Sequence, residues 1–490
     1  MKLREIKLTR KIKEKWIYSI AYLYLFSSIA IFLLGNVKYS ISIPVTILLF
    51  CANIKAIINA PNMEVKLFKN YKKAVIILVI ISIWVIFAGI GGFTWQNIWD
   101  HKFRNAIFMD LVGKQWPVMQ DGKALCYYLG FWLPSALVGK ILGLQWGYVF
   151  QIIWAITGIS IAFGIVCQYL KKIRIRNILI FIFYSGLDIF LFFIFSGLSL
   201  EEAFRQIING RHIELATTCF NSSSNTTLLF WLYNQIVPFW VGMMLLLTQK
   251  NSKSIGLIYS MLMLYSPFPL VALAPVMIYW IFRKQEDVEE NNIINNILKK
   301  IKYVCTFENI VSIILIVIIG LFIKSNTAVG KISILEFNME NIFKYVCYVF
   351  FEFIIYLIFI YKYNYKDMVL NILIITTFIL PFILMGNSYD FAYRTCIPLA
   401  FYIMLLIMKT LQNINIKNKV KIGLVIIICL GAVTPITEMI RTTKNEVAVL
   451  KKEIPSRSDS LSSVFIIEGN QCYDNFIADT NSIFYQYLAK

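Results

Sequence analysis

Long apolar runs separated by short polar loops dominate this chain from residue 16 to residue 440. Many of these runs reach the roughly 20 residues that a helix needs to cross a bilayer. The pattern predicts an all-α polytopic membrane protein with juxtamembrane helices. We expect about thirteen spans, at about Trp16 to Leu34, Ile41 to Ala60, Ala74 to Ile90, Trp146 to Leu170, Asn177 to Leu198, Leu228 to Leu247, Ile255 to Ser266, Pro269 to Phe282, Asn309 to Ile323, Phe343 to Tyr361, Met368 to Met385, Thr395 to Met408 and Ile422 to Ile440.

One apolar stretch, Leu125 to Leu144, does not fit this pattern because Pro134 and Lys140 interrupt it. The next run begins almost at once, at Trp146. If both stretches crossed, the basic loop Lys171 to Arg176 would lie outside, whereas Lys and Arg favour cytoplasmic loops. We therefore expect residues 125–144 to lie in the membrane plane or to insert only halfway.

Composition and charge agree with a membrane protein: 59% of the residues are hydrophobic, 15% are charged, and the net charge is +20. The basic residues gather in short loops that share one side if the N-terminus is cytoplasmic. This distribution sets topology and contacts anionic lipids, and it does not indicate nucleic-acid binding. We predict a multi-pass protein of the cell membrane with its C-terminus extracytoplasmic.

The chain divides into three predicted parts. Residues 1–73 form a basic tail and a transmembrane hairpin, residues 74–440 form a catalytic-type membrane module with a large external loop at 91–124, and residues 441–490 form a small extracytoplasmic cap. The nine cysteines show no CxxC or Cys/His spacing, and two histidines in the whole chain exclude a multi-His metal site.

The first long polar interruption is the stretch from Gly91 to Leu111, which follows the third predicted span directly. It brings together an acid, an imidazole, a guanidinium and an amide, flanked by indoles: Asp100, His101, Arg104, Asn105, Trp99 and Trp116. Aromatic belts and mixed charges also occur at membrane interfaces as simple anchors. We favour a functional site, because an anchor needs aromatics and Lys but not a clustered acid, imidazole and guanidinium.

Further polar clusters fall on the same predicted outer side. They are His212 with Glu214, Asn234 with Gln235, and Asp390 with Arg394. Together with the first cluster they are expected to line a cavity open to lipid and water. Asp188 and Glu352 lie inside predicted spans, where an ionisable group is costly and functional by default.

The order of an early span, an external loop with an acid near its start, and juxtamembrane helices resembles the membrane-embedded glycosyltransferases of the C superfamily (GT-C). The stretches around Asp100 and Asp390 also resemble a group of uncharacterised bacterial polytopic proteins. The GT-C resemblance implies transfer of a sugar from a polyprenyl-phosphate donor to an envelope glycan or lipid acceptor. The chain departs from the family in having an extra N-terminal hairpin and no second acid beside Asp100, which leaves the need for a divalent cation open.

On this hypothesis Asp100 is the general base, with Glu214 as the alternative, and Arg394 holds the donor phosphate. The residues predicted to bind substrate are His101, Arg104, Asn105, Trp99, Trp116, His212, Asn234, Gln235, Asp390 and Arg394, and no role is assigned to Asp188 or Glu352. Two other functions stay open: a flippase or transporter of a lipid-linked glycan, and a non-catalytic scaffold for envelope assembly.

Overall fold

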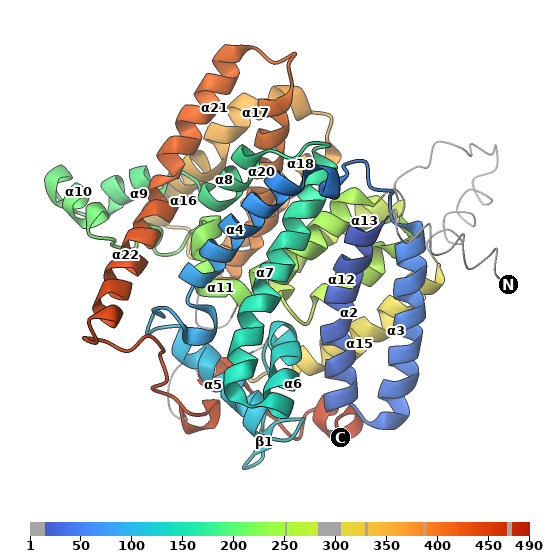
Figure 1. Ribbon diagram of the computed structural model, residues 1–490. Coiled ribbons are helices and arrows are strands. Elements are labelled where there is room, and N and C mark those ends of the chain that lie inside the picture. Colours follow the sequence, from blue (N-terminus) through green and yellow to red (C-terminus); the bar gives the residue numbers. More distant parts are fainter. Residues whose placement is uncertain (1–14, 250–251, 283–304, 329–331, 386–388, 468–472) are drawn as a thin grey trace, which may run out of the picture.

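The computed structural model describes residues 15–249, 252–282, 305–328, 332–385, 389–467 and 473–490. The predicted basic tail before residue 15 and most of the predicted charged loop that ends near residue 303 lie outside these ranges. Figure 1 shows a bundle of long helices, many of which run side by side.

Within the described residues, nine helical segments are long and apolar enough to cross a membrane. They indicate a multi-pass membrane protein, as the sequence predicts. They are Trp16–Asn36 (α2), Tyr39–Asn59 (α3), Leu144–Tyr169 (α7), Ile175–Phe195 (α8 and α9), Asn225–Thr248 (α11), Phe307–Lys324 (α15), Met339–Asn364 (α16 and α17), Asp390–Gln412 (α19 and α20) and Asn418–Leu450 (α21 and α22).

The predicted count of thirteen spans is not confirmed. The other four predicted spans are helical but shorter than a full crossing: α4 (Tyr71–Phe87), α12 (Ile255–Leu262), α13 (Pro267–Phe282) and α18 (Met368–Ile379). Pro267 starts α13 and Pro275 lies inside it, and Pro381 lies in the 3-10 turn that follows α18; proline limits helix length because it removes a backbone donor.

The stretch 125–144 forms a single turn of 3-10 helix and then the ten-residue helix α6 (Leu133–Leu142). Ten helical residues extend about 15 Å, half of a bilayer core of about 30 Å. Gly143, with φ of 98°, then reverses the chain so that α6 packs along the start of α7.

The centre of the bundle is formed by α11 and α20 (Ile397–Gln412). The spans that contain them are each 89% buried, whereas the span Asn418–Leu450 is only 33% buried. Large apolar side chains on the outer helices, such as Ile47 on α3 and Ile313 on α15, remain more than half exposed. Such exposed apolar faces suit a lipid environment.

One end of the bundle, at the bottom of Figure 1, carries the long loops and will be called the loop end. It contains α5 (His101–Gly113) and a three-stranded sheet in the order β1-β2-β5, made of Met119–Gln120, Lys123–Leu125 and Ile477–Asp479. A second pair of strands joins β3 (Ile332–Ile334) to β4 (Ile383–Met385).

The predicted C-terminal cap is not a separate part. Its first ten residues, Arg441 to Leu450, continue α22 (Val433–Leu450). Farther on, Asp110 of α5 accepts hydrogen bonds from the Ser463 hydroxyl and the Val464 amide, and β5 pairs with β2. The C-terminal residues therefore belong to the same layer as the 91–124 loop.

Four of the spanning segments are divided into two helices, one of them at Cys396 between α19 (Asp390–Thr395) and α20, and the breaks in the other three lie close together. The backbone leaves helical geometry between α8 (Ile175–Phe183) and α9 (Asp188–Phe195), a π-helix covers Phe350–Ile354 between α16 (Met339–Val349) and α17 (Ile355–Asn364), and α21 (Asn418–Gly431) ends one residue before α22. These interruptions meet. The Leu187 amide donates to the Phe351 carbonyl at 3.2 Å, and a Cβ on Gly431 would lie 2.9 Å from the Gly186 carbonyl oxygen.

Candidate functional site

The loop before α5 places Asp100 and Arg104 one helical turn apart. Arg104 Nη2 lies 3.4 Å from Asp100 Oδ2, with the Asp100 side chain 42% exposed and that of Arg104 6% exposed. The guanidinium also lies 5.6 Å from the ring centre of Tyr233. Its Nε and Nη1 atoms are buried and have no hydrogen-bond partner among the described residues. A buried cation with unused donors beside a water-facing acid can accept an anionic ligand.

Asp390 and Arg394 repeat this arrangement at α19 (Asp390–Thr395). Arg394 Nη2 lies 2.9 Å from Asp390 Oδ1, and the exposures are again 9% for the arginine and 43% for the acid. Arg394 also donates to the Gln235 side-chain carbonyl at 3.5 Å and packs over the ring of Phe268. Both pairs have the spacing Asp-x-x-x-Arg, a signal that was present in the sequence.

Tyr127 and Tyr128 lie near the charged pairs. The hydroxyl of Tyr127 is within electrostatic range of all four charged groups, Asp100, Arg104, Asp390 and Arg394. Burial raises the pKa of Tyr127, and the two arginines partly oppose that rise. The two tyrosine rings are 4.6 Å apart, and Tyr128 is also within electrostatic range of Asp390 and Arg394. We call Asp100, Arg104, Tyr127, Asp390 and Arg394 the Asp–Arg site.

The central helix α11 supplies Asn234 and Gln235 close to this site. Both side chains are buried, and Gln235 contacts Arg394. The Asn234 amide oxygen and nitrogen and the Gln235 nitrogen have no partner among the described residues. Buried amides without partners are expensive and suit a polar ligand.

His101 lies beside the Asp–Arg site but faces the protein interior. It is 1% exposed, and its Nε2 lies 3.0 Å from the Phe230 carbonyl oxygen, so the ring donates there. Burial and then the charge of Arg104 lower its pKa to about 3, which keeps the ring neutral. His101 also lines a small cavity with Trp95, Trp231 and Arg441.

Asn105 serves the fold. Its amide nitrogen donates to the Gln96 side-chain carbonyl at 2.7 Å and to the Ser458 carbonyl at 3.1 Å. The hydrogen bonds fasten the C-terminal segment to α5, and no described contact joins Asn105 to the arginine pairs.

The two tryptophans predicted to bind substrate lie apart from each other. Trp99 is 68% exposed next to Asp100. Trp116 follows the opposite end of α5, where its indole nitrogen donates to the Leu111 carbonyl at 2.8 Å and its ring packs on Gly35. Only Trp99 is therefore placed beside the Asp–Arg site.

His212 and Glu214 belong to a different cluster. Glu214 is buried and accepts from the Ser224 amide at 2.9 Å and the Thr227 hydroxyl at 2.6 Å. Burial and then the charge of Asp188 raise the pKa of Glu214 to about 7. His212 Nδ1 lies 2.8 Å from Glu438 Oε1. Burial lowers the pKa of His212, but the hydrogen bond and charge of Glu438 outweigh it, so that the pKa is raised overall.

These residues form what we call the acidic network: Asp188, Glu214, Glu352, Glu438 and His212. Arg441 pairs with Glu438 at one edge of the network, and the Trp231 indole donates to the same carboxylate at 3.0 Å. The network is buried between α9, α11, α22 and the π-helix. Glu214, the alternative base, is thus not part of the Asp–Arg site.

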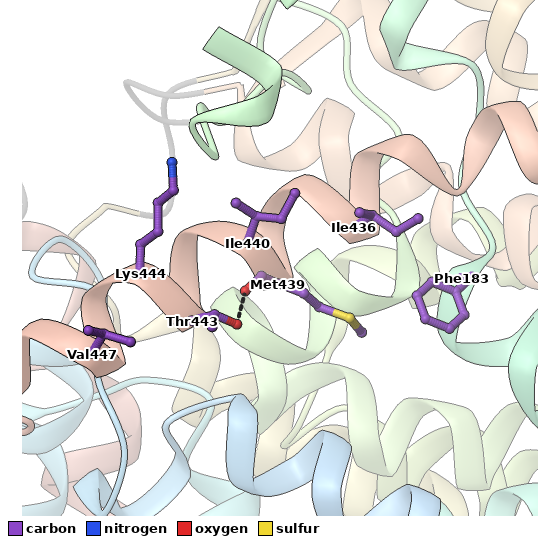
Figure 2. Close-up of a pocket in the computed structure, with 7 residues that line it drawn as sticks. All are labelled: Phe183, Ile436, Met439, Ile440, Thr443, Lys444 and Val447. Carbon is purple, nitrogen blue, oxygen red and sulfur yellow. Dashed lines mark hydrogen bonds between the residues drawn. The ribbon is translucent and has the colours of Figure 1, made fainter. Parts of the chain in front are cut away.

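An apolar groove of about 580 Å³ runs along α22 on the face opposite to Glu438 and Arg441. Figure 2 shows its lining, which is Phe183, Ile436, Met439, Ile440, Thr443, Lys444 and Val447. The Lys444 ammonium donates to the Asn209 side-chain oxygen at 2.9 Å. The groove therefore combines an apolar path with one cation.

In the part of the chain that the structure describes, no three His, Cys, Asp or Glu side chains are grouped closely enough to hold a metal ion. No family model, no curated protein and no solved structure matches this chain. The site's own chemistry is therefore the basis for a functional proposal.

Proposed function

We propose that the protein is a membrane-embedded glycosyltransferase that moves a hexosyl or pentosyl unit from a polyprenyl-phosphate donor to an envelope glycan or lipid acceptor. The observation that carries the proposal is that two Asp-x-x-x-Arg units, each with a buried arginine and a half-exposed acid, both lie within electrostatic range of Tyr127. Two buried guanidiniums suit a phosphate, and two half-exposed carboxylates suit a hydroxyl acceptor.

In this mechanism the acceptor oxygen attacks the anomeric carbon of the donor sugar. The bond from that carbon to the phosphate oxygen breaks, and its electron pair leaves on the phosphate. Arg394, supported by Arg104, offsets the growing negative charge, which is usually the largest catalytic contribution. Asp100 takes the proton of the acceptor hydroxyl, and its exposure keeps it accessible to that acceptor.

The remaining parts have supporting roles in the proposal. Trp99 offers a flat apolar surface to a sugar ring, and Gln235 orients Arg394. The groove along α22 offers an apolar path for the prenyl chain, and the basic loops contact anionic lipid. The site is proposed to open on the outer face of the membrane, with a cytoplasmic N-terminus, and the divalent cation question stays open.

The test compares cell-envelope polymers, by mass analysis, from cells with and without the protein. A transferase predicts one missing sugar decoration, restored by the parental chain and not by Asp100→Asn. Asp121→Asn is the matched control, because Asp121 lies in the same loop but at an exposed turn. Identical envelope glycans in both strains would contradict the proposal.

The alternative function, a flippase or transporter of a lipid-linked glycan, is favoured by one observation. Interrupted spans with buried carboxyls, as at Asp188 and Glu352, are common around the substrate and ion sites of transporters. This function predicts that lipid-linked oligosaccharide accumulates on the inner leaflet when the protein is absent. The same mass analysis, done on separated lipid and polymer fractions, distinguishes the two.

A further inference from the structure

Two carboxyl groups of the acidic network lie where the three helix interruptions meet. Asp188 is the first residue of α9, and Glu352 is the middle residue of the π-helix. Each is 1% exposed. Glu352 rests directly on Gly186, since a Cβ at that glycine would lie 1.7 Å from Glu352 Oε2. A side chain at position 186 would displace the carboxyl, so the break in the span is shaped to admit it.

The two carboxyls are neighbours, because Glu352 rests on Gly186, two residues before Asp188, and each carboxyl lies within electrostatic range of the other. Two carboxylates contain only acceptor oxygens, so a hydrogen bond between them requires one of the two groups to carry a proton. Two adjacent charges in a buried site also repel, and one of them is then kept neutral.

The other described hydrogen-bond donors do not satisfy all the oxygens of Asp188 and Glu352. The Ser185 and Thr434 hydroxyls donate to Asp188 Oδ2 at 2.8 Å and 3.0 Å. Asp188 Oδ1 and both oxygens of Glu352 receive no hydrogen bond from a donor in the described ranges. A buried, unpaired carboxylate costs several kcal/mol, so these oxygens require a ligand that is positively charged.

The titratable groups around the pair come from every element packed against it. They are Tyr184, Glu214, Tyr348, Tyr356, Cys396 and His212. All of them except His212 are acids or neutral in their usual state. His212 is committed to Glu438, which Arg441 also pairs. Among the residues that the structure describes, the surroundings therefore provide no cation dedicated to Asp188 and Glu352.

We propose that Asp188 and Glu352 form a proton-binding site that holds one proton between them and exchanges it with water through Glu214 and His212. Glu214 lies within electrostatic range of both Asp188 and His212, and its Oε2 atom is free to accept. The His212 side chain is 21% exposed, which gives the route an opening. Loss of the shared proton leaves two charges in the helix break and favours its opening. The inference does not depend on the transferase proposal.

The test is infrared spectroscopy of the full chain in lipid nanodiscs, with glutamate or aspartate carrying ¹³C in the side-chain carboxyl. Above the pKa of Glu214, where that carboxyl no longer contributes, the parental protein is expected to show a carboxylic-acid C=O band that one of the two labels shifts. Glu352→Gln and Asp188→Asn each remove that band, because an amide N–H then replaces the shared proton. Glu214→Gln keeps the band but slows its shift in deuterated water.

Glu308→Gln is the matched control, since Glu308 is a buried carboxyl that accepts from Asn59 on another helix, far from any carboxyl pair. It is expected to leave the band and its exchange rate unchanged. The proposal is overturned if the parental protein shows no such band, or if the band survives both substitutions. It is also overturned if the band appears only after sodium is removed, because the pair then holds a metal cation. Labelling the parental chain keeps the test valid even if a variant fails to fold.

Discussion

The Asp–Arg site and the acidic network use the same residue types in opposite ways. In the Asp–Arg site each carboxylate is more than 40% exposed and each has a buried arginine one turn away. In the acidic network Asp188, Glu214 and Glu352 are at most 2% exposed, and none of them forms an ion pair with a described Lys or Arg. An exposed carboxylate beside a cation is accessible to substrate, whereas a sealed carboxylate without a cation is costly to keep charged. The carboxyl groups of the Asp–Arg site and of the acidic network therefore differ in chemistry because they differ in exposure and in their charged partners.

The largest effect expected from this difference is on Asp100. Loss of a general base lowers a rate by about a hundredfold to ten-thousandfold, so Asp100→Asn should reduce sugar transfer by that factor while the protein still inserts in the membrane. Glu214→Gln should leave transfer near the parental rate. Transfer is measured with the reconstituted protein and polyprenyl-phosphate sugar. Normal transfer by Asp100→Asn together with lost transfer by Glu214→Gln would contradict the assignment of catalysis to the Asp–Arg site.

The next effect concerns the phosphate at Arg394. Arg394→Ala should lower transfer by about a hundredfold to a thousandfold, as expected for a group that stabilises transition-state charge. Arg394→Lys keeps the charge but loses the bidentate fork, and should retain part of the activity. Arg205→Ala is the control, because Arg205 forms only an exposed ion pair with Glu202. If Arg394→Ala transfers sugar at the parental rate with unchanged donor affinity, Arg394 serves only as the ion-pair partner of Asp390.

A packing substitution tests how tightly the acidic network is closed. Gly186→Ala drives a methyl group into the Glu352 carboxyl and should destabilise the protein by about 3 kcal/mol, the upper end for overpacking. Gly320→Ala in α15 is the control, since the nearest atom to its added Cβ is the Met263 methyl at 4.0 Å. Melting temperatures in the same detergent measure both. Equal melting temperatures for Gly186→Ala and Gly320→Ala would mean that the break between α8 and α9 can accommodate an added methyl group.

Stability should also fall with rising pH, by on the order of 2 kcal/mol between about pH 5 and pH 8. Glu214 has a folded-state pKa raised from 4.5 to about 7, so the folded protein binds more protons than the unfolded chain in that window. His212 is also raised above 6.5, and its contribution is present at low pH and lost as the pH rises through its folded pKa. Melting temperature against pH measures the slope, and Glu214→Gln should flatten it below pH 7. A slope of the opposite sign would contradict the burial of an acid at Glu214.

The smallest effect is expected at Trp116. It lies at the far end of α5 from Asp100, so Trp116→Phe should not change transfer, whereas Trp99→Ala should weaken sugar binding. Initial rates over a range of donor concentration separate the two. A loss of transfer in Trp116→Phe would extend the site along the whole of α5.

The apolar runs located nearly every helix, because burial in lipid demands continuous apolar sequence. They did not show which runs are broken, since the break at Tyr184 to Leu187 and the π-helix around Glu352 depend on contacts between distant segments. The apolar runs also did not predict helix length. The helix α12 has only eight residues, although its sequence is as apolar as that of a longer span.

The sequence predicted that the candidate residues lie on one side of the membrane, but it did not predict which of them share a site. The loop pattern placed Asp100 and Glu214 on the same predicted side, yet only tertiary packing decides that Glu214 points toward Asp188. Tyr127 and Tyr128 were not found, because they lie at the edge of the stretch whose topology was ambiguous. The repeated Asp-x-x-x-Arg spacing was the one available signal that joins Asp100 to Asp390.

The pairing of β2 with β5 has a consequence for how the protein is made. Tyr485 donates to the Leu125 carbonyl across 360 residues of sequence, and β5 supplies the only neighbour on one edge of β2 among the described strands. A ribosome therefore delivers the loop that bears Asp100 long before it delivers the strand that completes the layer. Contacts this distant in sequence form slowly and late. Until Ile477–Asp479 has been synthesised, β2 has an open edge, so the layer at the loop end can be completed only after the membrane helices that precede β5 have been made.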